Sequence, residues 1–183
     1  MKVTETGLPG VVTIEPRVFG DHRGFFLEVF RERAYADIVG PDLRFVQDNH
    51  SHSRRGVLRG LHCQVARPQG KLVHCVRGDI FDVVVDIDAA SPTFGQWVGV
   101  HLSERQPRQI YVPPGYVHGF QVISEQADVL YKCTNYYDPA SESGLIWNDP
   151  EVGVEWPIAQ PDLSGRDAAL PGLAHWREAS GRT

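Results

Sequence analysis

The chain has 183 residues, of which 42% are hydrophobic and 22% are charged, a globular composition that excludes wholesale disorder. Its formal net charge of −5 disfavours a general nucleic-acid binder but still permits a locally basic site for an anionic small molecule. No apolar run approaches the roughly 20 residues that span a bilayer, and the first residues lack the apolar core of a signal peptide. We therefore expect a cytoplasmic protein with no membrane or nucleic-acid partner.

The chain shows no internal repeat, low-complexity tract or Gly/Ser linker. We therefore expect a single domain over residues 1–183, with a peripheral tail over about 174–183. Three cysteines, Cys63, Cys75 and Cys133, are too few for a disulfide framework and form no CxxC pair.

In chain order, residues 31–38 predict a two-turn helix that ends before Gly40-Pro41. Short strands follow at intervals of about ten residues, separated by Gly and Pro turns, which predicts an all-β sandwich or barrel. The clearest strand covers residues 79–88, where Phe81, Val83 and Val85 alternate with Asp82 and other residues in the period of a half-buried strand. After Trp156 we expect at most one helical turn, near 166–170.

Two segments, around His62 and His118, resemble the two halves of a cupin barrel, a fold that often holds a metal ion. A metal-binding first half usually has His-x-His followed by a carboxylate. Here the sequence is His62-Cys63-Gln64, and no Asp or Glu follows before Asp79. We therefore expect no metal.

Seven strings occur in register along the chain and together resemble the dTDP-4-dehydrorhamnose 3,5-epimerase family. The resemblance runs from about Gly10 to Leu173, nearly the whole chain. The strings are VLRGLH (57–62), KLV (71–73), SPTFG (91–95), PGYVHGF (114–120), YKCTNYY (131–137), WNDP (147–150) and LSGRD (163–167).

This resemblance implies an all-β, cupin-type jelly roll without a metal, usually dimeric, that acts on a dTDP-linked 4-keto-6-deoxyhexose in dTDP-L-rhamnose biosynthesis. No cofactor is implied, because the C4 keto group itself acidifies the protons at C3 and C5. Either proton can be removed and returned on the opposite face. Such chemistry requires a base on one face, an acid on the other, and cations near the enolate oxygen.

Carried over by motif, the resemblance implies that His62 is the base, Asp167 its orienting partner and Tyr131 the acid. Lys71, with Arg59 nearby, would stabilise the enolate. Substrate contacts are implied for ten residues: Arg23, Phe26 and Glu28 on the nucleotide, from a strand that reaches the site of the partner subunit in a homodimer, then Gln47, Asn49, Arg59, His118, Glu142 and Arg166, with Tyr137 stacked on the thymine.

One position departs from the family pattern, which commonly has Lys before the catalytic Asp where this chain has Arg166. Arg keeps the positive charge and can bind a phosphate in bidentate fashion, but its reach and geometry differ. We expect activity to survive, with an altered placement of the diphosphate.

Taken singly, the same residues have plainer structural interpretations. His62 alone reads as a satisfied structural histidine, and Ser164-Gly165-Arg166-Asp167 also reads as a capping box. Tyr131 alone reads as an ordinary barrel tyrosine, with Tyr136 and Tyr137 as close competitors for the acid. Lys71 at a strand head is otherwise a solvated charge, and residues 23–28 an ordinary edge strand.

The sequence leaves three alternative functions open. The nearest is an enzyme of the same fold that epimerises one carbon only, or moves the keto group; the sequence discriminates poorly here. A non-catalytic nucleotide-sugar-binding cupin has no need for an acid–base pair such as His62 and Tyr131. A metal-dependent cupin oxygenase is the weakest alternative.

Overall fold

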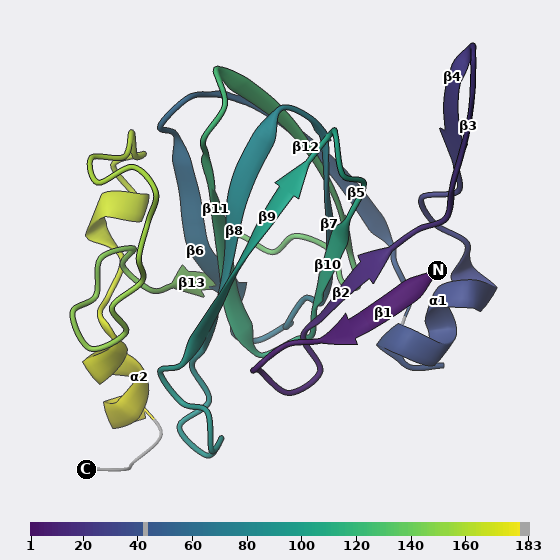
Figure 1. Ribbon diagram of the computed structural model, residues 1–183. Helices are drawn as coiled ribbons and strands as arrows, with labels where there is room; N and C mark the ends of the chain where they lie inside the picture. The colour runs from purple at the N-terminus through teal and green to yellow at the C-terminus, as the bar shows by residue number, and fades with distance from the viewer. Residues whose placement is uncertain (42–43, 180–183) are drawn as a thin grey trace.

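The computed structural model describes residues 1–41 and 44–179. Two antiparallel sheets face each other, one of six strands in the order β1-β2-β10-β7-β12-β5 and one of five in the order β13-β6-β11-β8-β9 (Figure 1). The predicted all-β architecture is confirmed, and the predicted helix is present as α1 (Glu32–Val39).

The strands of the six-stranded sheet are β1 (Lys2–Glu5), β2 (Val12–Glu15), β10 (Gln109–Val112), β7 (Lys71–Arg77), β12 (Gln126–Cys133) and β5 (Gln47–Arg54). Those of the five-stranded sheet are β13 (Glu142–Gly144), β6 (Leu58–Gln64), β11 (Tyr116–Val122), β8 (Asp79–Asp86) and β9 (Trp97–Ser103). Strands β3 (Val18–Asp21) and β4 (Gly24–Leu27) form a separate hairpin. The C-terminal segment, residues 145–179, carries a 3-10 turn, η1 (Asp167–Ala169), and a helix, α2 (Leu173–Ala179).

The space between the sheets is filled at one end by apolar side chains from both of them. Val73 on β7, Val84 on β8 and Val129 on β12 are each fully buried in this cluster. Alternation along each strand sends every second side chain inward, so the sheets meet through one face each. This core holds the two sheets at a fixed separation beside the polar pocket described below.

Strand β8 differs from its prediction as a half-buried strand, because both of its faces are buried. Ile80, Asp82 and Val84 face the space between the sheets, whereas Phe81 and Val83 face outward. The outward face is covered by the C-terminal segment, which packs Leu145, Val152, Leu173 and other apolar side chains against it. The predicted polar face of this strand is therefore the inner one.

The C-terminal segment also contains a helix that the sequence pattern did not predict. The single turn expected near 166–170 is present as η1, but α2 follows it. The amide of Leu173 donates to Asp149 Oδ2 at 2.8 Å, and Trp176 Nε1 donates to the Gly144 carbonyl at 3.1 Å. Of the predicted peripheral tail, 174–179 thus belongs to α2, while 180–183 lies outside the described residues.

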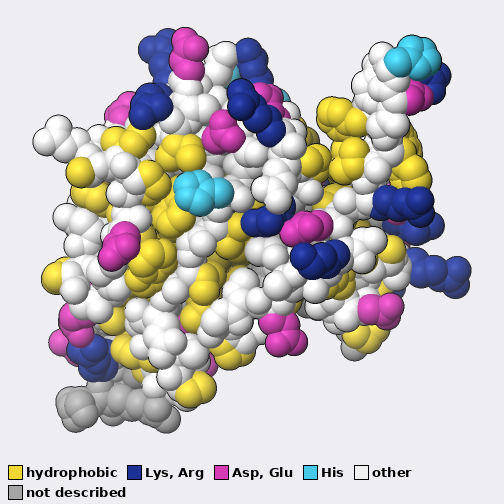
Figure 2. All heavy atoms as spheres, viewed as in Figure 1, with side chains coloured by type: hydrophobic (Ala, Val, Ile, Leu, Met, Phe, Trp, Pro, Cys, Tyr) yellow, Lys and Arg dark blue, Asp and Glu magenta, His cyan; other side chains and the backbone are white. Residues whose placement is uncertain are grey.

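Two elements lie on the side of the six-stranded sheet. Helix α1 packs Tyr35 and Val39 against its outer face. The β3–β4 hairpin stands away from both sheets (Figure 1), and Figure 2 shows hydrophobic side chains along it. Phe25 and Phe26 on this hairpin are 66% and 69% exposed, an unusual state for phenylalanine.

Candidate active site

A polar pocket of about 420 Å³ opens between the two sheets and is bordered by the C-terminal segment. Eleven of the fourteen predicted site residues line it: Gln47, Asn49, Arg59, His62, Lys71, His118, Tyr131, Tyr137, Glu142, Arg166 and Asp167. The other three, Arg23, Phe26 and Glu28, are not among its lining residues. Six further residues contribute to the wall: Ser51, Cys63, Gln64, Gln69, Phe120 and Ser164.

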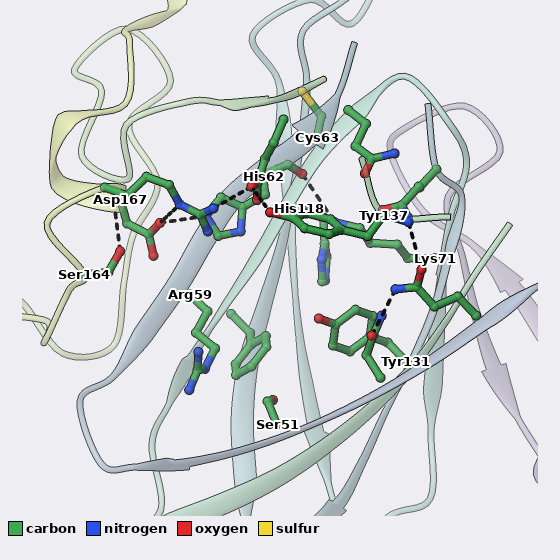
Figure 3. A pocket seen from close by; sticks show the side chains of 17 residues that line it. Ser51, Arg59, His62, Cys63, Lys71, His118, Tyr131, Tyr137, Ser164 and Asp167 are labelled. Atoms are coloured by element: carbon green, nitrogen blue, oxygen red, sulfur yellow. Dashed lines mark hydrogen bonds and ion pairs between the residues drawn. The ribbon is translucent and has the colours of Figure 1, made fainter. Parts of the chain in front are cut away.

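A histidine–carboxylate pair forms one wall (Figure 3). His62 Nε2 lies 2.7 Å from Asp167 Oδ1, although 105 positions separate the two residues in sequence. An ionised carboxylate only accepts hydrogen bonds, so Nε2 carries the proton and Nδ1 is left free to accept one. The Asp167 side chain is 5% exposed, which keeps this bond away from solvent.

The capping interpretation of Asp167 is half right. Ser164 Oγ accepts a hydrogen bond from the Asp167 amide at 3.0 Å, which closes the turn that leads into η1. The Asp167 carboxylate, however, turns to His62 instead of returning to the Ser164 backbone. The bond from Ser164 thereby holds the backbone of Asp167, the residue that orients the histidine.

The pKa of His62 lies below its ordinary value. Burial is the largest cause, the positive charges of Lys71 and Arg166 act in the same direction, and the bond to Asp167 opposes them. His62 is therefore neutral at pH 7, the state in which an imidazole can accept a proton.

An irregularity in β6 brings Arg59 and His62 to the same pocket, although strict alternation places them on opposite faces. The pairing of β6 with β11 shifts register between His118 and Phe120. The two strands approach so closely here that a Cβ added at Gly60 would lie 2.6 Å from the Gly119 Cα. Glycine at both positions permits that approach.

Tyr131 lies on the opposite wall from His62, on β12 of the six-stranded sheet (Figure 3). Burial raises the pKa of its phenol, so the hydroxyl stays protonated in the neutral range. A potential base and a potential acid therefore face one pocket from opposite sheets. This arrangement is the one that inversion of a carbon centre requires.

Lys71, at the start of β7, places its ammonium group on the same pocket. Its Nζ donates to the His62 carbonyl at 3.4 Å. Burial lowers the pKa of Lys71, while the negative groups around it, Asp82 and Glu142 among them, oppose the shift. The ammonium group of Lys71 is a hydrogen-bond donor in a partly desolvated position, where it is suited to stabilise an anionic oxygen.

The rim of the pocket is a small network around Glu142. Its Oε2 accepts a hydrogen bond from the Tyr137 hydroxyl at 2.7 Å and forms an ion pair with Arg166. The Tyr137 amide donates to Gln47 Oε1 at 2.8 Å, which ties the aromatic residue to β5. Tyr137 is 51% exposed, so its ring is free to receive a planar group.

Sequence reasoning missed Asp82, which holds the predicted residue His118. His118 Nε2 lies 2.9 Å and 3.0 Å from the two carboxylate oxygens of Asp82, and Asp82 is fully buried. The signal was present as a single acid in the apolar run Phe81-Asp82-Val83, but in a half-buried strand an acid is assigned to the solvent face.

Arg23, Phe26 and Glu28 lie on or just after the projecting hairpin. Arg23 bonds Asp21 within the hairpin, and Glu28 pairs with Arg31 at 3.2 Å. In this chain these residues are apart from the pocket, so the structure does not bring them to the other eleven.

Within residues 1–41 and 44–179, no cluster of three His, Cys, Asp or Glu side chains is placed to hold a metal ion. In the same part of the chain, no helix has the length and apolarity needed to cross a membrane.

Comparison with known proteins identifies the family. The family model described as dTDP-4-dehydrorhamnose 3,5-epimerase matches residues 5–175. The chain belongs to this family. The dTDP-4-dehydrorhamnose 3,5-epimerase of Salmonella typhimurium is 53% identical to this family member, over 93% of the chain and 94% of that protein.

A solved structure of a dTDP-6-deoxy-D-glucose-3,5-epimerase from Legionella pneumophila, in complex with dTDP-4-keto-L-rhamnose, superposes with a TM-score of 0.92. It is 49% identical and covers 94% of this chain and 93% of its own. A dTDP-4-dehydrorhamnose 3-epimerase from Streptomyces niveus is 42% identical, over 98% of this chain and 87% of that protein. This member of the epimerase family is an isomerase with the predicted cupin-like jelly roll.

Proposed function

We propose that the protein converts dTDP-4-dehydro-6-deoxy-D-glucose to dTDP-4-dehydro-L-rhamnose by inverting C3 and C5. The observation that carries this proposal is the pair of His62 and Tyr131, which face one 420 Å³ pocket from opposite sheets. The relatives named for the 3,5-epimerase activity support it, and the Legionella pneumophila protein binds dTDP-4-keto-L-rhamnose.

In this proposal His62 removes the proton from the carbon beside the keto group. Nδ1 accepts the proton while Nε2–H stays bonded to Asp167, whose charge stabilises the imidazolium that forms. The two electrons of the broken C–H bond move onto the C4 oxygen and form an enolate. No redox partner is needed, because the electrons return to carbon in the second half of the reaction.

Tyr131 then delivers a proton to the same carbon from the opposite face. The enolate electrons form the new C–H bond, the keto group is restored, and the configuration is inverted. Solvent returns a proton to the phenolate and removes one from His62, which resets both groups for the second carbon. The raised pKa of Tyr131 supports this role, because a protonated phenol is required at the start.

Lys71 stabilises the enolate in this reaction, and Arg59 lies on the same pocket. An ammonium group in a partly desolvated site interacts more strongly with a developing oxyanion than it would in water. Lys71 is held by the His62 carbonyl, so its position is linked to that of the base.

At the rim, Tyr137 receives the thymine and Arg166 the diphosphate. The exposed ring of Tyr137 and the guanidinium of Arg166, both anchored on Glu142, support this assignment. Gln47, Asn49 and His118 complete the substrate site from the two sheets.

The protein acts as a homodimer in this proposal, with Arg23, Phe26 and Glu28 reaching the partner's pocket. The support is the projecting hairpin, which exposes Phe25 and Phe26 and lies apart from its own pocket. Large exposed aromatic side chains of this kind mark surfaces that another chain covers.

Three free cysteines fit the reducing cytoplasm, where we place the enzyme.

Incubation with dTDP-4-dehydro-6-deoxy-D-glucose in deuterated water, followed by NMR, tests the reaction. We expect deuterium at both C3 and C5. Label at one carbon alone would assign the protein to the single-carbon activity of the Streptomyces niveus relative. Absence of label at both carbons would overturn the enzymatic proposal.

A further inference from the structure

The inner face of β5 carries a row of four polar side chains. Gln47, Asn49 and Ser51 line the pocket, and Ser53 follows at the next inward position. Three of the four have protein partners. Gln47 Nε2 donates to Asn49 Oδ1 at 3.1 Å, and Ser53 Oγ accepts from Arg59 Nε at 2.9 Å.

Ser51 is the exception in this row. Among the described residues, its Oγ is one of two buried side-chain polar atoms without a hydrogen-bond partner; the other, Arg108 Nε, is not a pocket group. Leaving a buried hydroxyl without a partner destabilises the folded protein, so such groups are rare and call for a reason. A ligand oxygen is a suitable partner where the group adjoins a binding pocket.

The surroundings of Ser51 place it away from the rim. Figure 3 shows Ser51 near Arg59 and Tyr131, across the pocket from His62. Ser51 Oγ is itself buried, whereas Tyr137 at the rim is 51% exposed. With the nucleotide at the rim, the group that reaches this inner end is the hexose.

We infer that Ser51 is a further substrate-binding residue whose hydroxyl hydrogen-bonds an oxygen of the hexose, an inference that rests on the proposed function. The inference requires Oγ to turn toward the pocket by rotation among the three staggered χ1 positions of serine. The hydroxyl is then both a donor and an acceptor for a sugar hydroxyl. The partner that the protein lacks is supplied by the substrate.

Calorimetric titration with two ligands that cannot react tests this inference: dTDP-glucose, which carries a hexose without a keto group, and dTDP, which carries none. We expect Ser51→Ala to weaken dTDP-glucose binding about three- to tenfold, the value of one neutral hydrogen bond, and to leave dTDP binding unchanged. The ligand-free melting temperature should stay the same or rise, because the variant removes an unsatisfied buried group.

Ser124→Ala is the matched control. Ser124 Oγ is satisfied, since it accepts from the Asp79 amide at 2.8 Å and donates to the Gln126 carbonyl at 2.7 Å, and it is not a pocket residue. We expect this variant to melt at a lower temperature and to bind both ligands normally. Ser51→Ala should thus weaken binding without loss of stability, and Ser124→Ala should lower stability without loss of binding.

Two results would overturn the inference: unchanged dTDP-glucose binding by Ser51→Ala, or an equal loss for dTDP and dTDP-glucose. The second would assign the hydroxyl to the nucleotide. Failure of the proposed function is distinguishable, because it would show as missing deuterium exchange in the unmodified protein.

Discussion

At the scale of a single residue, we expect the protonation of His62 to set how the reaction rate falls at low pH. Its pKa is lowered from the ordinary 6.5, so the neutral base persists below that pH. The rate should therefore fall as pH drops through a midpoint below 6.5. A pH profile of kcat/KM checks this expectation, and a midpoint clearly above 6.5 would contradict it.

Asp167→Asn should lower kcat about 10- to 100-fold, because an amide cannot stabilise the imidazolium formed during proton removal. The hydrogen bond and the charge of Asp167 both raise the pKa of His62. Loss of the charge should move the acid limb of the profile to still lower pH, even where the amide oxygen of Asn keeps the hydrogen bond. The comparison with His62→Asn, which should abolish nearly all exchange, separates positioning from base function.

Tyr131→Phe should separate proton removal from inversion. The variant keeps His62 and Lys71, so substrate protons should still exchange with deuterated water. The opposite face lacks its donor, so formation of the inverted product should fall about 10²- to 10⁴-fold. NMR of the recovered sugar measures both events, and normal inversion by Tyr131→Phe would show that another group is the acid.

At the scale of elements, the contact of β6 with β11 determines which side chains enter the pocket. A Cβ at Gly119 would meet the Arg59 carbonyl at 2.5 Å and the Gly60 Cα at 2.9 Å, both of them backbone atoms. Gly119→Ala should lower the free energy of unfolding by about 1–3 kcal/mol and reduce activity, because Arg59 and His118 lie beside it.

Urea denaturation and the deuterium assay measure these two effects. Gly7→Ala is the control, since its Cβ would meet only Val98 Cγ1 at 3.9 Å. It should unfold within about 0.5 kcal/mol of the unmodified protein. Equal behaviour of the two variants would argue against the steric role of Gly119.

At the scale of the whole molecule, Arg23, Phe26 and Glu28 lie outside the pocket of their own chain. This allows a test of whether two subunits together form each site. If Arg23 serves the partner's pocket, a mixed dimer of His62→Asn and Arg23→Ala subunits contains one doubly altered site and one intact site. Random mixing makes about half of the dimers mixed, so about a quarter of the normal activity should return.

The readout is the activity of co-refolded subunits against each variant refolded alone. If Arg23 acted within its own subunit, every site in the mixture would carry one defect and no activity would return. Sedimentation of the same samples shows whether dimers are present.

Much of this protein could be predicted from local pattern. The strands, their turns and α1 follow from alternation and from Gly and Pro, which are local signals in the chain. The motifs around His62, Tyr131 and Asp167 indicated the family, and eleven of fourteen expected residues do line one pocket. The roles assigned to them remain predictions that the variants above address.

The rest depended on contacts between distant segments. The outer face of β8 is buried only because the C-terminal segment covers it, so Asp82 could not be assigned to the interior from its own strand. Helix α2 is short, and the amide of its first residue, Leu173, donates to the carboxylate of Asp149, 24 residues earlier. Short helices of this kind depend on tertiary packing more than on their own propensity.

The sequence by itself thus determined the all-β class and the family, because both are encoded in local patterns and motifs. Only the tertiary structure decided that Asp82 faces inward to His118 and that Ser51 Oγ lacks a partner. Each of these facts is a pairing, or a missing pairing, between strands and loops far apart in the chain. Whether a polar group is satisfied is a property of what surrounds it in space.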